Sequence, residues 1–560
     1  MIRFRSGALL LASTILAACG PSSDSSGGRE FGGTLIIATG GEAKHLLPPF
    51  VYETTGKAVS DMLFEPLAMV SDDLDTMGDK SFAPRLADRW EWSADSMSIA
   101  FHIDPRARWH DGRPVVAADV KYTFDLVMDP KTSSFVAPNL RNIDSVTVRD
   151  SSVAVVWYRA RSPEQFFQFV GHLNPIPSHV FGGIASEELA QSAAARAPVG
   201  NGPFRFVRWV PQATLELVAD TAHWRGRPKL DRLIWSTRAD PNAAMASVMT
   251  GESDFIEVLR GDAIKQIADS KVARPVSRPA SDFGVMVFRI RNGARGEKPH
   301  PVLGDREVRR ALTMAIDRKT LARNLLDTLG LPGIGPLTRT MLRGDTTFTQ
   351  LPYDLEGAKR LLESAGWRDG NGDGVREKGG QPLTFSIMAP SSSSVRQLTA
   401  TILQGQLKKV GAKVDISSLE VNTMQSLVGA GKFDAVLLGM TSDPSRGSLA
   451  QDWGTEAALT GDGSNFSMYM NPGLDAVLDS ASGAFDIDKA RGHYRRALEI
   501  LIADAPAVWL YEAKGSGAIH RRVRPAKMRA DAWWAHLDEW SIDPSQAIAR
   551  DSIGLRAPNP

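Results

Sequence analysis

Alternation of apolar and polar residues predicts a series of β-strands in the first half of the chain. Residues 98–103 carry apolar side chains at every second position, the pattern of a half-buried strand. Two further alternating runs occupy residues 143–158, and the turn Arg149-Asp150-Ser151 between them predicts a hairpin. Residues 33–39 form a continuous apolar run closed by two glycines, which is typical of a strand buried on both faces.

Apolar residues spaced three or four positions apart predict helices in other parts of the chain. We expect helices over residues 59–67, 120–127, 305–318 and 396–410. In the last of these, the spacing places Leu398, Ile402 and Val410 on the apolar side.

Residues 383–440 alternate between strand and helix patterns, in the order strand, helix, strand, helix, strand. Elements of these lengths in this order predict parallel strands with crossover helices, and hence a doubly wound α/β lobe. Ligands of such sheets meet the loops beyond the carboxyl ends of the strands. We therefore expect ligand contacts in the loop at 440–445 and in the segment 451–453 that follows it.

The composition indicates an ordinary globular protein of more than one domain. At 560 residues the chain is too long for one core, and its 43% apolar and 23% charged residues are typical of soluble domains. The net charge is +1, or −1 once a leader containing Arg3 and Arg5 is removed. A balance so near zero gives no support for binding to nucleic acid.

The N-terminus has the features of an export signal. A short basic segment precedes an apolar run from Ala8 to Ala18 that is too short to span a bilayer. The run ends in Leu16-Ala17-Ala18-Cys19-Gly20, which resembles a bacterial lipoprotein cleavage box. We expect lipidation at Cys19, the only cysteine, so the mature chain could form no internal disulfide. An uncleaved signal anchor is the alternative.

The motif Trp109-His110-Asp111-Gly112-Arg113-Pro114 connects the strand at 98–103 to the helix at 120–127. Because Asp-Gly is first of all turn chemistry, we interpret His110 and Asp111 as structural, with a ring packed beside a turn. A catalytic dyad or a metal ligand is the alternative.

Two glycine-rich segments also have competing interpretations. The glycines of Gly200-Asn201-Gly202 permit a positive-φ turn before a strand that carries Phe204 and Phe206 inward. The competing interpretation is a phosphate-binding loop, but no helix start follows and there is no Lys-Ser or Lys-Thr. Residues 369–374 fit the start of a calcium-binding loop, but its twelfth position is Gly380 in place of glutamate. We favour a plain hairpin turn there.

Several spaced motifs together resemble the family 5 extracellular solute-binding proteins, the peptide and nickel receptors of ABC importers. The block from Trp90 to Met128 is similar to the family's Trp, strand, His-Asp-Gly-x-Pro and Ala-Asp-Val pattern. Residues 305–318 resemble its Val-Arg-x-Ala…Ala-Ile-Asp-Arg signature, and residues 353–367 match a third element. The resemblance extends from Gly33 to about Trp540.

This resemblance implies an α/β fold with the two-lobed periplasmic-binding-protein type II architecture, an inserted subdomain (three domains in all) and a hinge between the lobes. We expect the chain to cross between lobes near residues 285–290 and 508–514. The expected division is a signal peptide at 1–18, a flexible tether at 19–32, lobe 1 at 33–71, 196–287 and 511–548, the inserted subdomain at 72–195, lobe 2 at 288–510, and a disordered tail at 549–560.

The resemblance also implies a ligand site. Peptide receptors of the family receive the ligand's amino terminus on an Asp in the loop after the strand at 433–438, and Asp443 is the matching residue. An Asp-Pro turn is its alternative role. We expect Trp453 to form a wall of the pocket, and Phe50 and Tyr52 to line the cleft.

We expect the protein to capture di- or oligopeptides and deliver them to the permease subunits of an ABC importer. It would be a monomer without cofactor, anchored by lipid to a membrane of the cell envelope and facing the periplasm or exterior. A receptor for a nickel chelate or an oligosaccharide is the alternative within the family. The rival from another class is an exported hydrolase, although the sequence contains no Gly-x-Ser-x-Gly and no His-Glu-x-x-His motif.

Overall fold

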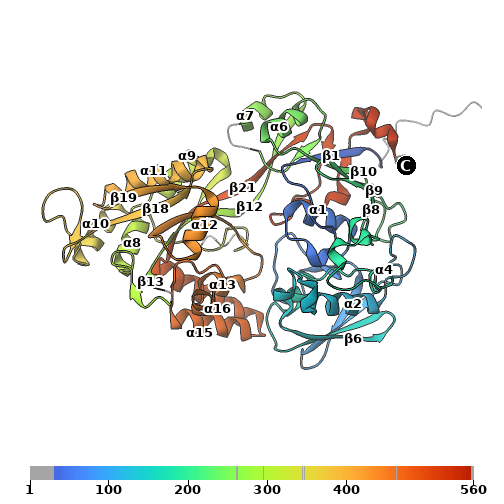
Figure 1. Ribbon diagram of the computed structural model, residues 1–560, viewed down its shortest axis with the longest axis horizontal. Coiled ribbons are helices and arrows are strands. Elements are labelled where there is room, and N and C mark those ends of the chain that lie inside the picture. Colours follow the sequence, from blue (N-terminus) through green and yellow to red (C-terminus); the bar gives the residue numbers. More distant parts are fainter. Residues whose placement is uncertain are drawn as a thin grey trace, which may run out of the picture.

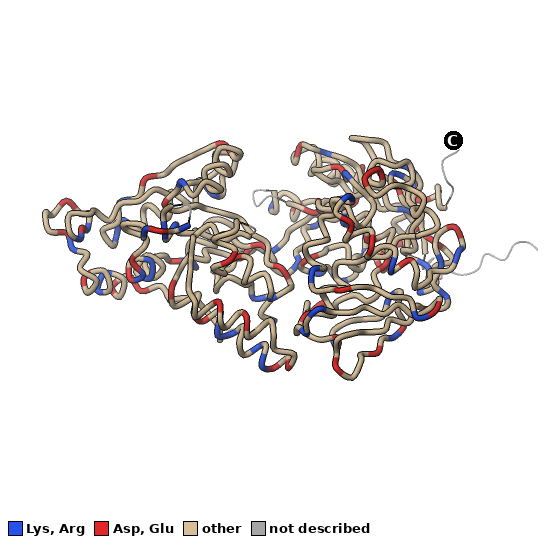
Figure 2. The backbone as a smooth tube through the Cα atoms, turned by 60° about the horizontal axis from the view of Figure 1, so that its bottom comes forward, with Lys and Arg blue, Asp and Glu red and all other residues tan. Residues whose placement is uncertain are grey.

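Two lobes lie side by side and are joined by two long neighbouring strands (Figure 1). The computed structural model describes residues 31–259, 263–293, 295–343, 345, 347–461 and 463–555. The expected signal peptide, Cys19 and most of the expected tether therefore lie outside the described residues. Basic and acidic residues are interspersed over both lobes, in keeping with the near-zero net charge (Figure 2).

The connection between the lobes consists of β12 (Ala273–Phe288) and β21 (Ala507–His520), which pair antiparallel along most of their length. Residues 282–288 of β12 also pair with β20 (Ala435–Thr441) in lobe 2, whereas residues 518–519 of β21 pair with β11 (Phe255–Ile256) in lobe 1. Two of the three register shifts, between Arg278 and Asp282, lie between these two sets of partners, and the third, between Gly284 and Val285, lies beside β20.

The crossing point on β12 differs from the expected range of 285–290. Residues 285–288 of that range pair with β20 in lobe 2, and the crossing falls before residue 282. On β21 the pairing with β15 (Gly330–Pro332) in lobe 2 ends at Ala513, so the crossing lies at the end of the expected range 508–514 and just beyond it.

Lobe 1 is built on the apolar strand β1 (Thr34–Thr39), which pairs in parallel with β10 (Arg232–Thr237) and β11. The sheet continues through β9 (Thr214–Ala219) and β8 (Phe204–Val210), both antiparallel. Its helices are α1 (Thr54–Leu63), α6 (Pro241–Met249) and α7 (Ala263–Ala268). The small pairs β2 (Ala68–Val70) with β3 (Phe82–Pro84), and β22 (Val523–Arg524) with β23 (Ser541–Ile542), lie outside the main sheet.

A separate four-stranded antiparallel sheet lies within residues 72–195. Its order is β4 (Ala87–Trp92), β5 (Ser98–Ile103), β7 (Val153–Tyr158), β6 (Ile143–Asp150), and it confirms the predicted hairpin. The accompanying helices are α2 (Ala117–Met128), α3 (Gln165–Val170), α4 (Ser178–Phe181) and α5 (Ala193–Arg196). Figure 1 shows this sheet below the β1 sheet, on the same side of the connection.

Lobe 2 confirms the predicted alternation of strands and helices at 383–440. Its elements are β18 (Thr384–Pro390), α11 (Ser394–Lys408), β19 (Lys413–Leu419), α12 (Val421–Gly429) and β20. β18 pairs in parallel with β19 and β20, but β20 pairs antiparallel with β12, so the sheet is mixed. The other helices are α8 (Arg306–Met314), α9 (Arg318–Leu326), α10 (Leu355–Ser364), α13 (Ser448–Trp453), α14 (Thr455–Thr460), α15 (Pro472–Gly483) and α16 (Ile487–Asp504). Two short hairpins complete it: β13 (Arg291–Asn292) with β14 (Lys298–Pro299), and β16 (Glu377–Lys378) with β17 (Gln381–Pro382).

The helix expected at 59–67 is displaced by about one turn. α1 begins at Thr54 and ends at Leu63, and Phe64 is already extended. The residue before a proline avoids the helical conformation, so Glu65-Pro66 stops the helix earlier than its apolar residues alone would suggest.

The glycines at 200 and 202 act through close approach and do not use the positive φ that glycine permits. Neither glycine has a positive φ. A Cβ on Gly200 would overlap the carbonyl oxygen of Leu63, and one on Gly202 would overlap that of Met62. The turn therefore needs glycine because it packs directly on the end of α1.

His110 has a structural role, as predicted, and it holds the turn at 200–202 through hydrogen bonds that the sequence did not indicate. Its Nε2 lies 2.9 Å from the carbonyl oxygen of Gly202, and the Gly200 amide lies 3.2 Å from its Nδ1. The ring thus donates through Nε2 and accepts through Nδ1, which requires a neutral imidazole. Burial lowers the pKa of His110 to about 4, which keeps it neutral.

The C-terminal segment corrects the expectation of a disordered tail at 549–560. Residues Ala549–Ile553 form a short helix, η8, and Asp551 accepts hydrogen bonds from the Thr34 amide (2.9 Å) and from Arg522 Nη1 (2.6 Å). Arg550 Nη2 reaches Asp254 at 2.7 Å. Charged partners buried in lobe 1 hold this segment, which composition alone did not indicate; residues 556–560 lie outside the described residues.

Candidate ligand-binding cavity

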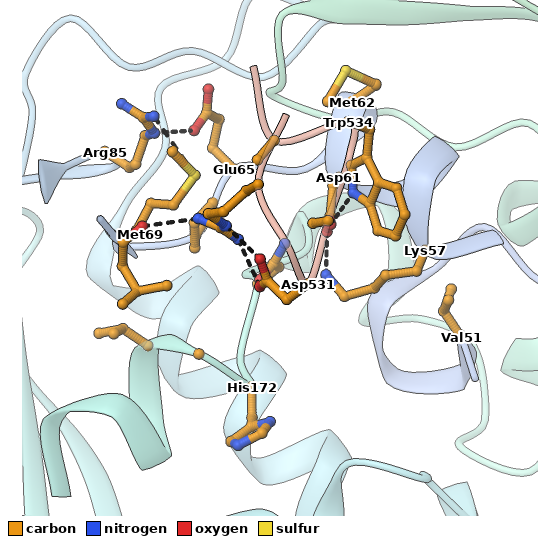
Figure 3. Close-up of a pocket in the computed structure, with 18 of the residues that line it drawn as sticks. Val51, Lys57, Asp61, Met62, Glu65, Met69, Arg85, His172, Asp531 and Trp534 are labelled. Atoms are coloured by element: carbon orange, nitrogen blue, oxygen red, sulfur yellow. Dashed lines mark hydrogen bonds and ion pairs between the residues drawn. The ribbon is translucent and has the colours of Figure 1, made fainter. Parts of the chain in front are cut away.

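A cavity of about 450 Å³ opens where lobe 1 and the inserted sheet face the loop after β20. Its lining comes from α1 and the segment 64–70, from the end of α3, and from residues 529–538. Lobe 2 contributes Asp443 and Pro444. Figure 3 shows Trp534, Lys57 and Val51 on one side of this pocket, with Asp531 at its centre.

Asp443 lies in the lining because β20 ends at Thr441 and Ser442 is held from both sides. The Ser442 amide donates to the Ser281 carbonyl oxygen at 2.8 Å, and its hydroxyl accepts from the Thr338 amide at 3.3 Å. Asp443 Oδ1 then accepts from the Ser445 amide at 2.7 Å, so the residue both forms a turn and lines the cavity.

The electrostatic surroundings of Asp443 favour a positive ligand. Desolvation raises the pKa of Asp443, and the nearby carboxylates of Glu164 and Asp531 raise it further. Among the described residues, no basic side chain forms an ion pair with it. A carboxylate in this situation is stabilised by any cation that enters the cavity.

Other carboxylates of the cavity already have cationic or N–H partners. Asp61 is paired with Lys57 and accepts from Trp534 Nε1 at 2.8 Å. Asp531 accepts two hydrogen bonds from one edge of the Arg529 guanidinium, from Nε at 2.6 Å and from Nη2 at 3.0 Å (Figure 3). These pairs shape the wall and leave little free charge.

Glu65, at the inner end of the cavity, is 4% exposed and neutralised by two arginines. Arg225 Nε lies 3.1 Å from its Oε1, and Arg85 Nε lies 3.5 Å from its Oε2. Arg225 also lies 3.8 Å from Asp538, whose pKa is raised by burial although Arg225 opposes the shift. A buried group of this kind fixes segments far apart in the sequence.

His172 contributes a neutral ring to the floor of the cavity. Burial lowers its pKa to about 4, and the positive charge of Lys57 acts in the same direction. The ring therefore carries no charge that would repel a cationic ligand near neutral pH.

The predicted site residues fall in different places. Asp443 and Tyr52 line the cavity, and Tyr52 is 52% exposed at its mouth. Phe50 is buried and lies outside the lining of this cavity. Trp453 is also buried, with its ring centroid 5.7 Å from that of Trp509, and it is not among the lining residues.

Asp452, the neighbour of Trp453, has an unusual titration. Desolvation and the charge of Asp443 together raise the pKa of Asp452 to about 6. Asp443 in the cavity lining and Asp452 thus form an acidic pair, and a nearby cation would favour its ionised form.

The sequence interpretation missed the contribution of residues 529–538. Arg529 donates to the Val70 carbonyl oxygen at 2.8 Å while it holds Asp531, and Trp534 covers Asp61. The local sequence marks this segment only by an Arg-x-Asp pair beside two tryptophans. These residues reach the cavity because the chain returns to lobe 1 after β21, which local sequence does not show.

The loop at 369–374 is closed by its own hydrogen bonds. Asp369 accepts from the amides of Gly372 and Gly374, and Asp373 accepts from that of Val375.

Within the described residues, no group of three or more His, Cys, Asp or Glu side chains is arranged to hold a metal ion. None of the helices in the described part of the chain is both long and apolar enough to cross a bilayer.

Two lobes joined by paired strands, with a cavity at their junction, define a receptor that can hold a small solute between its halves. The family described as bacterial extracellular solute-binding proteins, family 5 (middle region), matches residues 81–456. The chain belongs to this family, which is a family of solute-binding proteins and not of enzymes.

Comparisons with individual proteins agree with this assignment. The oligopeptide-binding protein AppA of Bacillus subtilis is 22% identical over 95% of this chain and 97% of its own length. The di/tripeptide-binding protein 2 of Pseudomonas aeruginosa is 25% identical over 77% of this chain and 81% of its own.

Solved structures show the same fold. AppA in complex with a nonapeptide superposes with a TM-score of 0.71 at 21% identity, covering 91% of this chain and 99% of AppA. NikZ from Campylobacter jejuni in complex with Ni(L-His) gives a TM-score of 0.73 at 24% identity, covering 92% and 99%. The protein thus has the two-lobed type II periplasmic-binding-protein architecture, with a mixed sheet.

Proposed function

We propose that this protein is the solute-binding component of an ABC importer, and that it captures di- or oligopeptides in the cavity between its lobes and delivers them to the membrane permease. The observation that carries the proposal is Asp443, a carboxylate of the lining without a basic partner among the described residues. A peptide's terminal ammonium supplies the missing cation.

Around this carboxylate the cavity suits varied side chains. Met69, Val70 and Phe167 provide apolar surface, and Trp534 and Tyr52 provide aromatic surface. Pockets that combine apolar walls with a few charged groups fix a ligand's orientation and tolerate different residues. The peptide-binding relatives support the same ligand class.

The remaining parts of the proposal concern location and assembly. Residues 1–18 would be removed as a signal peptide, and Cys19 would carry the lipid that holds the mature monomer at the membrane. Lobe 1 would comprise residues 33–71, the segment from 196 to about 281 and the return segment from about 514, with 72–195 as the inserted subdomain. Mass spectrometry of the N-terminal fragment of the wild-type protein should find Cys19 as the first residue with acyl chains attached; an unmodified Cys19, or a fragment that still contains residues 1–18, would contradict the anchor.

Mass spectrometry of the ligands that co-purify with the mature protein tests the proposed function. We expect a population of short peptides with free amino termini, at no more than one per chain. Recovery of a nickel chelate such as that named for NikZ, or of an oligosaccharide, would overturn the proposed peptide class.

A further inference from the structure

Glu164 lies across the boundary between the two lobes and is almost completely enclosed. It immediately precedes α3, whose residues Phe167 and Val170 line the cavity, and only 3% of its surface is exposed. A buried carboxylate is costly unless hydrogen-bond donors surround it, so its partners indicate what it does.

Four donors converge on the Glu164 carboxylate, and three of them come from lobe 2. Oε1 accepts from the Thr76 hydroxyl (2.5 Å) and from the Arg446 amide (2.9 Å). Oε2 accepts from the Ser445 hydroxyl (2.7 Å) and from the Gly447 amide (3.2 Å). The carboxylate therefore binds the Ser445 hydroxyl and the backbone amides of Arg446 and Gly447 from the opposite lobe.

Residues 445–447, which bind Glu164, belong to the turn that holds Asp443 in position. The Ser445 amide donates to Asp443 Oδ1, and the hydroxyl of the same serine donates to Glu164. Ser448 further restrains the turn by donating from its hydroxyl to the Ser445 carbonyl oxygen at 2.8 Å. Ser445 thus links the interlobe carboxylate directly to the carboxylate of the cavity.

We propose that Glu164 is a positioning residue that couples closure of the lobes to the placement of Asp443. When the lobes separate, Glu164 loses its three partners at 445–447 and the turn that presents Asp443 is released. When they close, the same contacts restore the turn and bring a second negative charge towards the ligand's cationic end. The part of this inference that concerns the ligand rests on the proposed function.

Amide hydrogen exchange on the full mature chain without ligand tests the contact itself. In Glu164→Gln, one acceptor becomes an amide donor that faces existing donors, so we expect the 445–447 amides to exchange at least about tenfold faster. Glu188→Gln, which removes an exposed carboxylate of the same subdomain, is the matched control and should leave them unchanged. Ser445→Ala removes one donor while Glu164 stays, and should give a smaller increase. Unchanged exchange in both Glu164→Gln and Ser445→Ala would overturn the proposal.

A binding experiment separates positioning from a general structural role. Peptides recovered from the wild-type protein are compared with their N-acetylated forms in wild type, Glu164→Gln, Asp443→Asn and the double variant. We expect Glu164→Gln to weaken free-amine peptides about tenfold and acetylated ones much less, and the double variant to resemble Asp443→Asn. Equal losses for both peptide forms would contradict positioning. If the wild type yields no peptide, the proposed function fails, and the exchange experiment still decides whether Glu164 holds the turn.

Discussion

Asp443 differs from its neighbours in the cavity because its partner is a backbone amide of its own turn. Asp61 and Asp531 each have a basic side chain in contact. A neutral replacement at Asp443 therefore removes the attraction for a cationic ligand and leaves no buried arginine or lysine without its partner.

Asp443→Asn should weaken binding of free-amine peptides about 30-fold, or about 2 kcal/mol, because an ion pair with the ammonium is lost. N-acetylated peptides should lose much less. Calorimetric titration of both peptide forms measures the difference, with Asp488→Asn on α16 as the control because that side chain is 94% exposed. Equal losses for both forms would remove Asp443 from the ligand site.

Asp452 predicts a pH dependence of binding near 6. Its pKa is raised to about 6, so between pH 4 and 6 the folded, ligand-free protein binds a proton that the unfolded chain releases. The contribution of Asp452 to the free energy of unfolding therefore rises as the pH falls through 6. A bound cation has the opposite preference, because it favours the ionised carboxylate. Affinity for cationic peptides should fall about threefold to tenfold from pH 7 to 5. Asp452→Asn should reduce this fall, and an identical pH profile in the variant would contradict the assignment.

His110 predicts a pH dependence of stability. Its pKa is about 4 in the fold against about 6.5 in an unfolded chain, so its contribution is complete above pH 6.5 and declines as pH falls towards 4. His110→Gln cannot titrate and should show a smaller decrease in melting temperature between pH 7 and 5 than wild type. The partly exposed His493→Gln serves as the control. An unchanged decrease in His110→Gln would argue against a neutral imidazole at this turn.

At the scale of single residues, the sequence predicted the position of Asp443 better than the identity of its neighbours. A loop beyond the carboxyl end of a buried strand is recognisable from the pattern, and Asp443 lies in it. Whether Trp453 or Phe50 faces a cavity depends on packing partners distant in sequence, such as Trp509 beside Trp453. Arg529 and Asp531 were missed for the same reason.

At the scale of elements, hydrophobic periodicity identified most strands and helices but not always their exposed faces. The helix expected at 396–410 is present, yet Leu398 is 47% exposed and the buried residues include Thr399 and Leu403. The face that packs is chosen by β18 and β19 beneath it, and sequence spacing alone does not distinguish between two adjacent apolar stripes.

The C-terminal element η8 is held on lobe 1 by a buried cluster of charged residues: Asp254, Arg522 and Asp551. Arg522 and Asp254 are both inaccessible to solvent, and Arg522 Nε lies 2.8 Å from Asp254 Oδ1. Asp551 completes the cluster through Arg522 Nη1. Such groups are strongly interdependent because each would be buried without compensation if its partner were removed.

Asp254→Asn should therefore destabilise lobe 1 by about 3–5 kcal/mol, and Asp551→Asn by about 1–3 kcal/mol. Asp269→Asn, which breaks an exposed ion pair with Lys265, should cost less than about 1 kcal/mol. Urea unfolding of the three variants measures the order of effects. A loss for Asp551→Asn no larger than that for Asp269→Asn would show that η8 is not fastened in solution.

At the scale of the whole molecule, the paired strands β12 and β21 form the connection on which the lobes can move. Two of their three register shifts, between Arg278 and Asp282, lie between the partners in lobe 1 and those in lobe 2, a stretch in which β12 pairs with β21 but not with β20. Sequence patterns predicted both strands, but they placed the passage of β12 between the lobes several residues too far along the chain. An apolar run does not reveal which lobe its residues pair with.

The central claim is that the two lobes close on a solute and leave it chemically unchanged. Small-angle X-ray scattering during titration with the recovered ligand tests this most directly. The radius of gyration should decrease and reach a plateau at one ligand per chain, with the ligand recovered intact from the same sample. A radius that stays constant at saturation, or a ligand that is converted to another compound, would contradict the account.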